Sequence, residues 1–270
     1  MLDVRDLRKT FFPDTPNEVR ALQGVSCQIL EGSFVVVIGT NGSGKSTLLN
    51  AVAGTFPLDA GAITLAGQDV TGWSEHRRAA LIGRVFQNPF SGTAPGMTIA
   101  ENLAMAARRG HRPGLGWALP RRLRDAFADR VRSLRMGLED RLDNEIGTLS
   151  GGQRQALTLL MATWRKPALL LLDEHTAALD PKSAEQVIAL THQLVTHDHL
   201  TTLMVTHAMS QAVNLGDSLI MMHRGRIIHA LAGEDKRRVR AEDLLARFDE
   251  VRRMDQLDAG AASLLAANYM

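Results

Sequence analysis

The segment Gly39–Ser46, with the sequence GTNGSGKS, constrains the fold of this chain more than any other feature. It matches the template G-x-x-x-x-G-K-[ST], in which backbone N–H groups of a glycine-rich loop converge on phosphate oxygens. The N-terminus of the following helix adds a partial positive charge. An apolar run, Phe34–Ile38, leads into the segment, and a helical pattern, Lys45–Ala53, leads out of it. The sequence therefore predicts a strand–loop–helix unit that binds phosphate groups.

The residues of this loop have separate predicted roles. Lys45 is expected to reach the β- and γ-phosphates, Ser46 to bind Mg²⁺, and Thr47 to donate to the nearer phosphates. An ordinary glycine-rich turn between a strand and a helix is the alternative reading. The phosphate-binding candidates in this loop are Gly39, Asn41, Gly42, Ser43, Gly44, Lys45, Ser46 and Thr47.

Two more apolar runs, Leu169–Leu172 and Thr202–Thr206, have the pattern of fully buried strands. Strands without polar alternation are typical of a parallel sheet that is covered by helices on both faces. Helices are expected between and after them, over Gln153–Trp164 and Lys182–Val195. All three apolar strands end in polar residues, at the sheet edge where α/β proteins bind ligands. The predicted fold class is α/β, with a mainly parallel core sheet.

The flanking segments predict additional structure. Residues 1–30 are expected to form an antiparallel part of short strands and turns, with another strand over residues 62–66. Residues 217–232 are typical of a hairpin that turns at Arg224–Gly225.

The segment 88–150 is rich in Gly, Pro and Arg, and helices are expected at about residues 98–109 and 121–135. We interpret it as a helical insertion in the α/β core. Together with the next helix it makes a helical subdomain of about residues 88–165. The tail, residues 251–270, is expected to be a loosely attached helix.

Composition excludes several classes of protein. The chain has 270 residues, of which 45% are hydrophobic and 22% charged, as in ordinary globular proteins. Its single cysteine, Cys27, excludes an internal disulfide and a cysteine-based zinc site. No apolar run approaches a membrane span, and the charged N-terminus lacks the core of a signal peptide. These features predict a cytoplasmic location. The net charge of +2 does not require nucleic acid as a partner.

Two acidic residues, Asp173 and Glu174, follow the leucine strand. An Asp at the sheet edge can hold the Mg²⁺ of a bound nucleotide. The adjacent Glu points to the other side of the strand and can orient or deprotonate a water that attacks the γ-phosphate. The alternative is a structural capping pair.

A second glycine cluster, Leu149–Gln153 (LSGGQ), precedes the predicted helix from residue 153. A helix N-terminus with exposed amides and a serine hydroxyl can bind a second phosphate group. The alternative is a plain helix cap, in which Ser150 caps and the glycines turn.

These motifs occur in the order Gly39–Ser46, Gln87, Leu149–Gln153, Leu169–Glu174, Ala178–Asp180 and His207. In this order they resemble an ABC-type ATP-binding cassette, over about residues 1–250. The resemblance implies ATP and Mg²⁺ as ligands and ATP hydrolysis as the activity. One departure is His175, which stands where many cassettes have proline and to which we assign no catalytic role.

The resemblance also implies residue roles. Phe11 stands where cassettes stack an aromatic on adenine, with Phe12 as a less favoured substitute. Gln87 contacts Mg²⁺ and the attacking water, and it hinges the helical insertion. His207 contacts the γ-phosphate and positions Glu174. Asp180 communicates across a dimer. In that head-to-tail dimer each ATP lies between Lys45 of one chain and the segment Ser150, Gly151, Gly152 and Gln153 of the other.

Several stretches, including Asn50–Phe56 and Gly83–Pro89, resemble the ATPase subunits of bacterial importers with branched-chain-amino-acid-type permeases. Some members of this group are linked to aromatic amino acids. The resemblance implies transmembrane permease subunits, a periplasmic or lipid-anchored substrate-binding protein, and a peripheral place on the cytoplasmic face of the inner membrane. A permease helix is expected in a groove beside Gln87, lined by Phe90, Met97, Ile99 and Leu103.

The basic stretch and a group of histidines each have an ordinary structural interpretation. The basic stretch Arg108–Arg135 is either a solvated helical face or a surface for anionic headgroups or the permease. The histidines His192, His197 and His199 lack matching ligands, so we interpret them as a surface loop.

Two other functions remain open. One is a soluble ABC ATPase that acts on a protein scaffold, as in iron–sulfur cluster assembly. The other is an ABC ATPase that handles nucleic acid. Such proteins usually carry coiled coils, zinc modules or two cassettes, which this chain lacks, so no nucleic-acid partner is expected.

Overall fold

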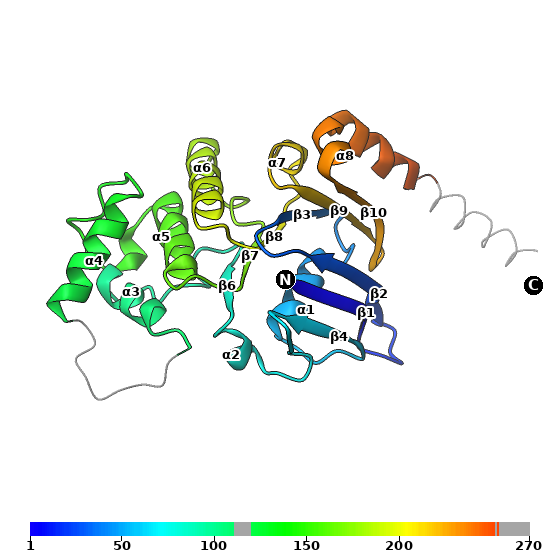
Figure 1. Ribbon diagram of the computed structural model, residues 1–270, viewed down its shortest axis with the longest axis horizontal. Coiled ribbons are helices and arrows are strands. Elements are labelled where there is room, and N and C mark those ends of the chain that lie inside the picture. Colours follow the sequence, from blue (N-terminus) through cyan, green and yellow to red (C-terminus); the bar gives the residue numbers. More distant parts are fainter. Residues whose placement is uncertain (111–119, 252, 254–270) are drawn as a thin grey trace, which may run out of the picture.

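The computed structural model describes residues 1–110, 120–251 and 253, and they form two sheets with helices around them (Figure 1). The larger sheet has the strand order β10-β9-β3-β8-β7-β6. Strands β9, β3, β8, β7 and β6 are parallel, and β10 is antiparallel to β9. Their bounds are β3 Phe34–Gly39, β6 Ile82–Val85, β7 Leu169–Asp173, β8 Thr202–Val205, β9 Ser218–His223 and β10 Arg226–Ala232. The α/β fold class is confirmed.

The smaller sheet is antiparallel, with the order β2-β1-β4-β5. It contains β1 Leu2–Phe11, β2 Val19–Ile29, β4 Ala60–Leu65 and β5 Gln68–Asp69. The predicted antiparallel part is confirmed, as is a strand near residues 62–66, but two long strands occupy residues 1–30 in place of several short ones. Register shifts interrupt their pairing, for example between Val4 and Leu7, and these shifts obscure the alternation in the sequence.

The strands of the larger sheet divide their side chains between two cores. Val35 and Val37 of β3 face the antiparallel sheet, together with Leu171 of β7. Val36 and Leu172 face the opposite side, toward the helices. This two-sided burial follows from the alternation of side chains along a strand and explains the uninterrupted apolar runs. Helix α1, Lys45–Ala53, lies between the two sheets and contacts strands of both (Figure 1).

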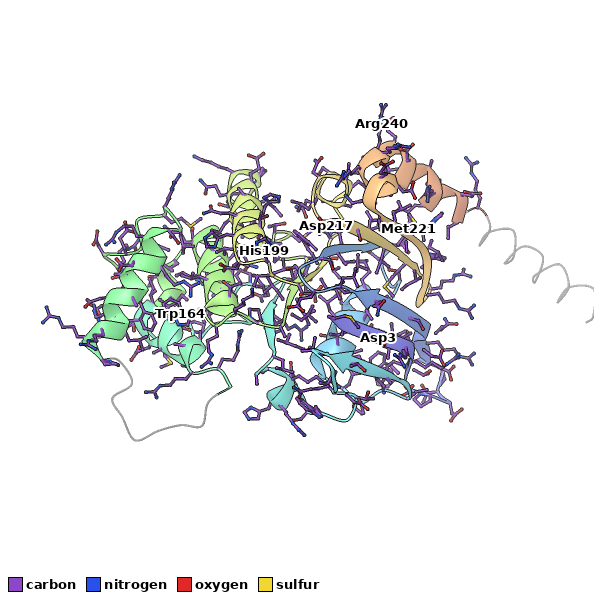
Figure 2. The ribbon with its side chains drawn as sticks, in the orientation of Figure 1. Asp3, Trp164, His199, Asp217, Met221 and Arg240 are labelled. Carbon is purple, nitrogen blue, oxygen red and sulfur yellow. The ribbon has the colours of Figure 1, made fainter. Side chains whose placement is uncertain are left out.

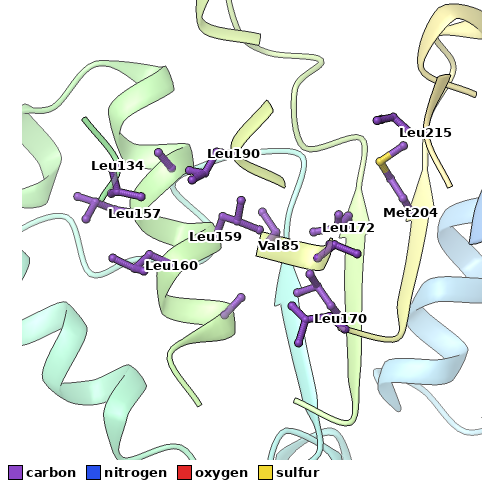
Figure 3. Packing of buried hydrophobic residues seen from close by; sticks show 14 of the residues in the cluster. Val85, Leu134, Leu157, Leu159, Leu160, Leu170, Leu172, Leu190, Met204 and Leu215 are labelled. Carbon is purple, nitrogen blue, oxygen red and sulfur yellow. The ribbon is translucent and has the colours of Figure 1, made fainter. Parts of the chain in front are cut away.

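The helical insertion contains α3 Ile99–Ala107, α4 Arg121–Arg132, the 3₁₀ turn Ile146–Thr148 and α5 Gly151–Thr163. Leu157, Leu159 and Leu160 of α5 continue the core beyond Leu170 and Leu172 of β7 (Figure 3). The C-terminal end of α5 is covered by arginines. Arg109 donates to Ala162 O and Arg165 O. Arg130 donates to Trp164 O, and its guanidinium lies 4.8 Å from the centroid of the Trp164 ring. Trp164 is labelled among the helices of the insertion in Figure 2.

The remaining helices are α2 Glu75–Arg78, α6 Pro181–His197, α7 Met209–Asn214, α8 Gly233–Arg238 and a helical segment over residues 241–251. Of these, the sequence predicted α6 alone. The hairpin of β9 and β10 turns at Arg224 and Gly225, both with positive φ, as a tight hairpin requires. The predicted tail helix lies almost entirely outside the described residues. No helix among the described residues combines the length and the apolar character needed to cross a membrane.

Candidate functional site

The glycine-rich loop occupies the carboxyl end of β3, and two of its glycines, Gly39 and Gly44, are required by close packing. A Cβ atom on Gly39 would lie 2.4 Å from Met222 O and from Ser43 Oγ. Gly44 has φ of 98°, and a Cβ there would lie 2.5 Å from Ala21 O. The loop is therefore pressed against both sheets, and its outer residues Asn41 and Gly42 are exposed. Gly42 has φ of 74°, which favours glycine over other residues.

Lys45 folds back across this loop. Its ammonium donates to Gly39 O at 2.9 Å and to Thr40 O at 3.1 Å, and the residue is 6% exposed. Burial lowers the pKa of the ammonium, while the nearby carboxylates of Glu174 and Asp173 act in the opposite direction. A cation buried among carbonyl oxygens costs stability unless it is paired, so this position favours an anionic ligand.

One buried hydroxyl in the loop has no partner. Within the described residues, Ser43 Oγ makes no hydrogen bond, although Ser43 is 1% exposed. A buried polar atom of this kind costs free energy unless a ligand or water satisfies it. Together with the N-terminus of α1, it fits the oxygens of a phosphate group. Thr47, in the first turn of α1, is half-buried.

Two of the three metal-ligand candidates, Ser46 and Asp173, are in contact. Ser46 Oγ donates to Asp173 Oδ1 at 3.2 Å, which joins the start of α1 to the end of β7. Burial raises the pKa of the Asp173 carboxyl, and the hydrogen bond from Ser46 partly offsets this rise. Hydroxyl and carboxylate oxygens are ligands that Mg²⁺ prefers, so the pair fits this ion. Gln87 is exposed and lies two residues after Val85. Because Val85 pairs with Leu172 of β7, Gln87 lies at the same sheet edge as Asp173.

Glu174 and His207 follow the neighbouring strands β7 and β8. His207 Nδ1 lies 3.2 Å from Glu174 Oε2. Glu174 has a left-handed backbone with φ of 42°, and its N–H donates to Val205 O at 3.0 Å. A left-handed backbone is uncommon for a residue other than glycine and is found at functional sites. The carboxylate is largely buried, whereas the His207 ring is mostly exposed.

The LSGGQ segment forms the N-terminus of α5. Ser150 Oγ accepts from Gln153 N and Gln153 Oε1 accepts from Ser150 N, both at 3.3 Å, so the pair forms a capping box. The alternative reading was right that Ser150 caps the helix, but wrong that the glycines turn, because Gly151 and Gly152 are helical. Among the described residues, no hydrogen bond or ion pair joins this segment to residues 39–47.

Gly152 is required for packing. A Cβ atom there would lie 2.7 Å from Ser183 Cβ, in the first turn of α6. Asp180 caps that helix by accepting from Ser183 N at 3.0 Å, and this bond lowers the pKa of its carboxyl. The segment that carries Asp180 is therefore packed against the LSGGQ helix.

The two aromatic candidates differ in their surroundings. Phe11 is half-buried, and its ring meets Phe56 edge-on with 5.2 Å between centroids, while Lys9 Nζ lies 5.6 Å from its centroid. Phe12 is 66% exposed and has φ of 51°.

The predicted groove beside Gln87 needs a correction. Ile99 and Leu103 are fully buried in the core and line no surface groove, because the helix α3 turns them inward. Phe90 and Met97 are exposed as predicted, and Met105 is a third exposed apolar residue of this region, which the sequence analysis missed. One face of the Phe90 ring is covered by Arg154, whose guanidinium lies 3.7 Å from the ring centroid.

The histidine prediction was partly wrong. His192 and His197 belong to helix α6 rather than to a loop, and His199 follows that helix with φ of 47°. All three are exposed.

The segment 241–251 adds a wall to the site that the sequence analysis missed. Leu245, Phe248 and Asp249 line a cleft of about 490 Å³ together with Gly39, Thr40 and Asn41 of the loop. The apolar spacing of Leu244, Leu245 and Phe248 was the available signal, since Leu244 and Phe248 are buried.

A family model described as ABC transporter matches residues 22–177. The chain belongs to the ABC transporter family. This cassette is the ATP-binding subunit of an ABC transporter, and proteins of this kind hydrolyse ATP.

Relatives support the same family. The cassette is 40% identical to the "Tyrosine transport ATP-binding protein" of Clostridioides difficile, over 92% of this chain and 99% of that protein. It is 33% identical to the "Lipoprotein-releasing system ATP-binding protein LolD" of Ruegeria sp., over 84% of this chain and 97% of that protein.

Two solved structures of ATP-binding cassettes are similar to this chain. A bacterial ABC transporter cassette, solved as a dimer, superposes with a TM-score of 0.74 and 26% identity, over 86% of this chain and 98% of that one. The same alignment values hold for a dimeric post-hydrolysis state of an ATP-binding cassette with ADP and Pi.

Proposed function

We propose that this cassette hydrolyses ATP between two copies arranged head to tail, and that it thereby drives a bacterial importer of a small solute, with an amino acid as the favoured class. One observation carries the two-copy site. Two helix N-termini, those of α1 and α5, carry motifs that are predicted to bind phosphate, and no hydrogen bond or ion pair joins the two motifs within the described part of the chain. A second copy brings the Ser150 segment of one chain to the Lys45 loop of the other.

In this site each residue has a defined task. The loop amides, Lys45 and Ser43 Oγ hold the phosphates, and Phe11 stacks on the adenine. Glu174 accepts a proton from the attacking water or orients it, and His207 holds the Glu174 carboxylate from the neighbouring strand. Catalysis consists of positioning and stabilisation of charge, as in phosphoryl transfer generally.

Ser46, Asp173 and Gln87 would hold Mg²⁺ that arrives with the nucleotide. When bound, the ion would supply positive charge that offsets the charge developing on the phosphate oxygens. The Ser46–Asp173 hydrogen bond keeps the two oxygen donors together before the nucleotide enters. Asp180, packed beside the α5 helix, is the contact to the other copy.

The exposed apolar residues Phe90, Met97 and Met105 are the surface to which permease subunits dock. They belong to the segment after Gln87 and to α3, so docking is close to a residue of the nucleotide site. Docking there would hold the cassette peripherally at the cytoplasmic face of the membrane. A periplasmic or lipid-anchored binding protein delivers the substrate to the permease.

Amino-acid import is favoured because the relative named for tyrosine transport is 40% identical over nearly its full length. The relatives named for lipoprotein release are 33–34% identical, and they make export the second candidate.

The test is a pull-down of tagged Glu174→Gln cassette with ATP from detergent-solubilised membranes of the source cells. We expect a multi-spanning permease and a substrate-binding protein. Vesicles that contain the same permease with the wild-type cassette should take up tyrosine, whereas those with the Glu174→Gln cassette should not. Met105→Ala and Phe90→Ala should reduce recovery of the permease, whereas exposed His192→Ala on α6 should not. Recovery of soluble scaffold proteins or nucleic acid alone would contradict the importer.

A further inference from the structure

The side-chain amide of Gln211, on helix α7, joins the turns that carry Glu174 and His207. Gln211 Nε2 donates to Thr176 Oγ1 at 3.1 Å, and Gln211 Oε1 accepts from Thr206 Oγ1 at 2.7 Å. The two threonines are 8% and 4% exposed, so the threonine ends of these hydrogen bonds are buried, whereas Gln211 is half-buried. Both ends of one amide are used, one as donor and the other as acceptor.

The two bonded threonines flank the catalytic candidates. Thr176 is two residues after Glu174, in a turn closed by the bond from Ala177 N to Glu174 O at 2.9 Å. Thr206 directly precedes His207, and Thr206 Oγ1 also accepts from Ala208 N at 3.1 Å, so this hydroxyl closes a turn around His207. The Gln211 amide therefore adds a side-chain link between the two turns, beyond the β7–β8 pairing that ends at Asp173 and Val205.

Helix α7 and the turn that contains Glu174 are each held in place by further contacts. Ala212 of α7 is fully buried. Near the C-terminal end of α7, Val213 O accepts a hydrogen bond from Lys236 Nζ at 2.7 Å. The Glu174 turn has a second anchor, because His175 Nε2 lies 3.0 Å from Thr191 Oγ1 of α6. Thr191 uses its own proton to donate to Val187 O, so the His175 ring is the donor in this pair.

We propose that Gln211 is a positioning residue, which holds Glu174 and His207 at the separation that ATP hydrolysis needs. This inference rests on the roles that the proposed function gives to those two residues. Gln211 itself lies outside the nucleotide site. Loss of the bridge should let the two turns separate, and a displacement on the order of 1 Å at a reacting group can lower a rate by up to about a hundredfold.

The experiment uses the full chain and measures kcat, KM for ATP and the thermal midpoint. Gln211→Met keeps the length of the side chain and removes both hydrogen bonds. Thr176→Val removes one acceptor, and Thr176→Ser retains it. We expect Gln211→Met and Thr176→Val each to lower kcat on the order of tenfold, with KM within about twofold of the wild type. The double variant, Gln211→Met with Thr176→Val, should lower kcat no further than the worse single variant does, because both substitutions break the same bridge.

Matched controls separate this role from stability. Ser210→Ala changes the exposed neighbour of Gln211 on α7 and should leave kcat unchanged, and Thr176→Ser should keep most of it. A lower thermal midpoint with wild-type kcat in Gln211→Met would overturn the proposal, as would losses that multiply in the double variant. Glu174→Gln is measured beside them. If it hydrolyses ATP at the wild-type rate, the proposed site is wrong whatever Gln211 does.

Discussion

His207 Nδ1 and Glu174 Oε2 lie 3.2 Å apart, across the carboxyl ends of two adjacent parallel strands. Register fixes this approach, because Asp173 of β7 pairs with Val205 of β8. The residues that follow each strand are then neighbours at the sheet edge. The contact links the carboxylate that is proposed to activate water with a ring that can hold its orientation.

His207→Ala should lower kcat by about 10²-fold or more, because the carboxylate loses the partner that orients it. ATP affinity should change little, since the loop and Lys45 remain. Single-turnover hydrolysis beside equilibrium nucleotide binding measures the two effects separately. His197→Ala, which removes an exposed histidine from α6, is the matched control. A loss of the same size in both variants would remove His207 from its role.

Lys45→Met should weaken ATP binding while it leaves the thermal midpoint unchanged or higher. The reason is that the ammonium is buried and its pKa is lowered by that burial, so in the absence of phosphate the charge costs stability. Titration with ATP and thermal unfolding without nucleotide are the two measurements. Unchanged nucleotide affinity would contradict the assignment of the loop. A large fall in the midpoint would make Lys45 a structural residue.

Phe11→Ala should weaken binding of ATP and GTP to a similar extent, by about 1–3 kcal/mol, because stacking reads only the face of a base. Phe12→Ala, at the exposed neighbouring position, is the control and should bind both nucleotides as the wild type does. Fluorescence titration of both variants with both nucleotides tests this pair. The reverse result would transfer the stacking role to Phe12.

Much of this fold could be predicted from the sequence. The buried strands β3, β7 and β8 were evident because two-sided burial leaves uninterrupted apolar runs. Helix α5 begins two residues earlier than predicted, because Ser150 and Gln153 form a capping box that makes the glycines helical. Strand β6 was missed, since four residues that include Gly83 and Arg84 have little apolar signal.

The contacts of the site could be predicted only in part. The glycine-rich loop and the acidic pair have defined spacing in the sequence, so their residue types were sufficient. The bridge from Gln211 to Thr176 and Thr206 joins three elements, and no spacing in the sequence indicates it. The inward direction of Ile99 and Leu103 depends on how α3 packs against α5, which a list of apolar residues does not specify.

Gly152→Ala should be more harmful than Gly151→Ala. The new Cβ at residue 152 would lie 2.7 Å from Ser183 Cβ, whereas at residue 151 the nearest atom is the flexible Leu179 Cδ2 at 3.2 Å. Overpacking of this kind costs about 1–3 kcal/mol, which a thermal or urea unfolding curve resolves.

A second variant tests the cause of that loss. Ser183→Gly removes the clashing atoms and leaves the N–H that Asp180 caps, so it should restore part of the stability in the Gly152→Ala background. If Gly152→Ala is as stable as the wild type, the packing of α5 on α6 is not as described.

The most direct test of the two-copy site is light scattering of the Glu174→Gln cassette with and without ATP, beside its hydrolysis rate. The account predicts that the variant binds ATP with wild-type affinity, barely hydrolyses it, and forms a dimer in ATP that falls apart when ATP is removed. The same dimer should be lost when Ser150→Arg is added. A Glu174→Gln cassette that hydrolyses ATP at the wild-type rate and stays monomeric in saturating ATP would contradict the account.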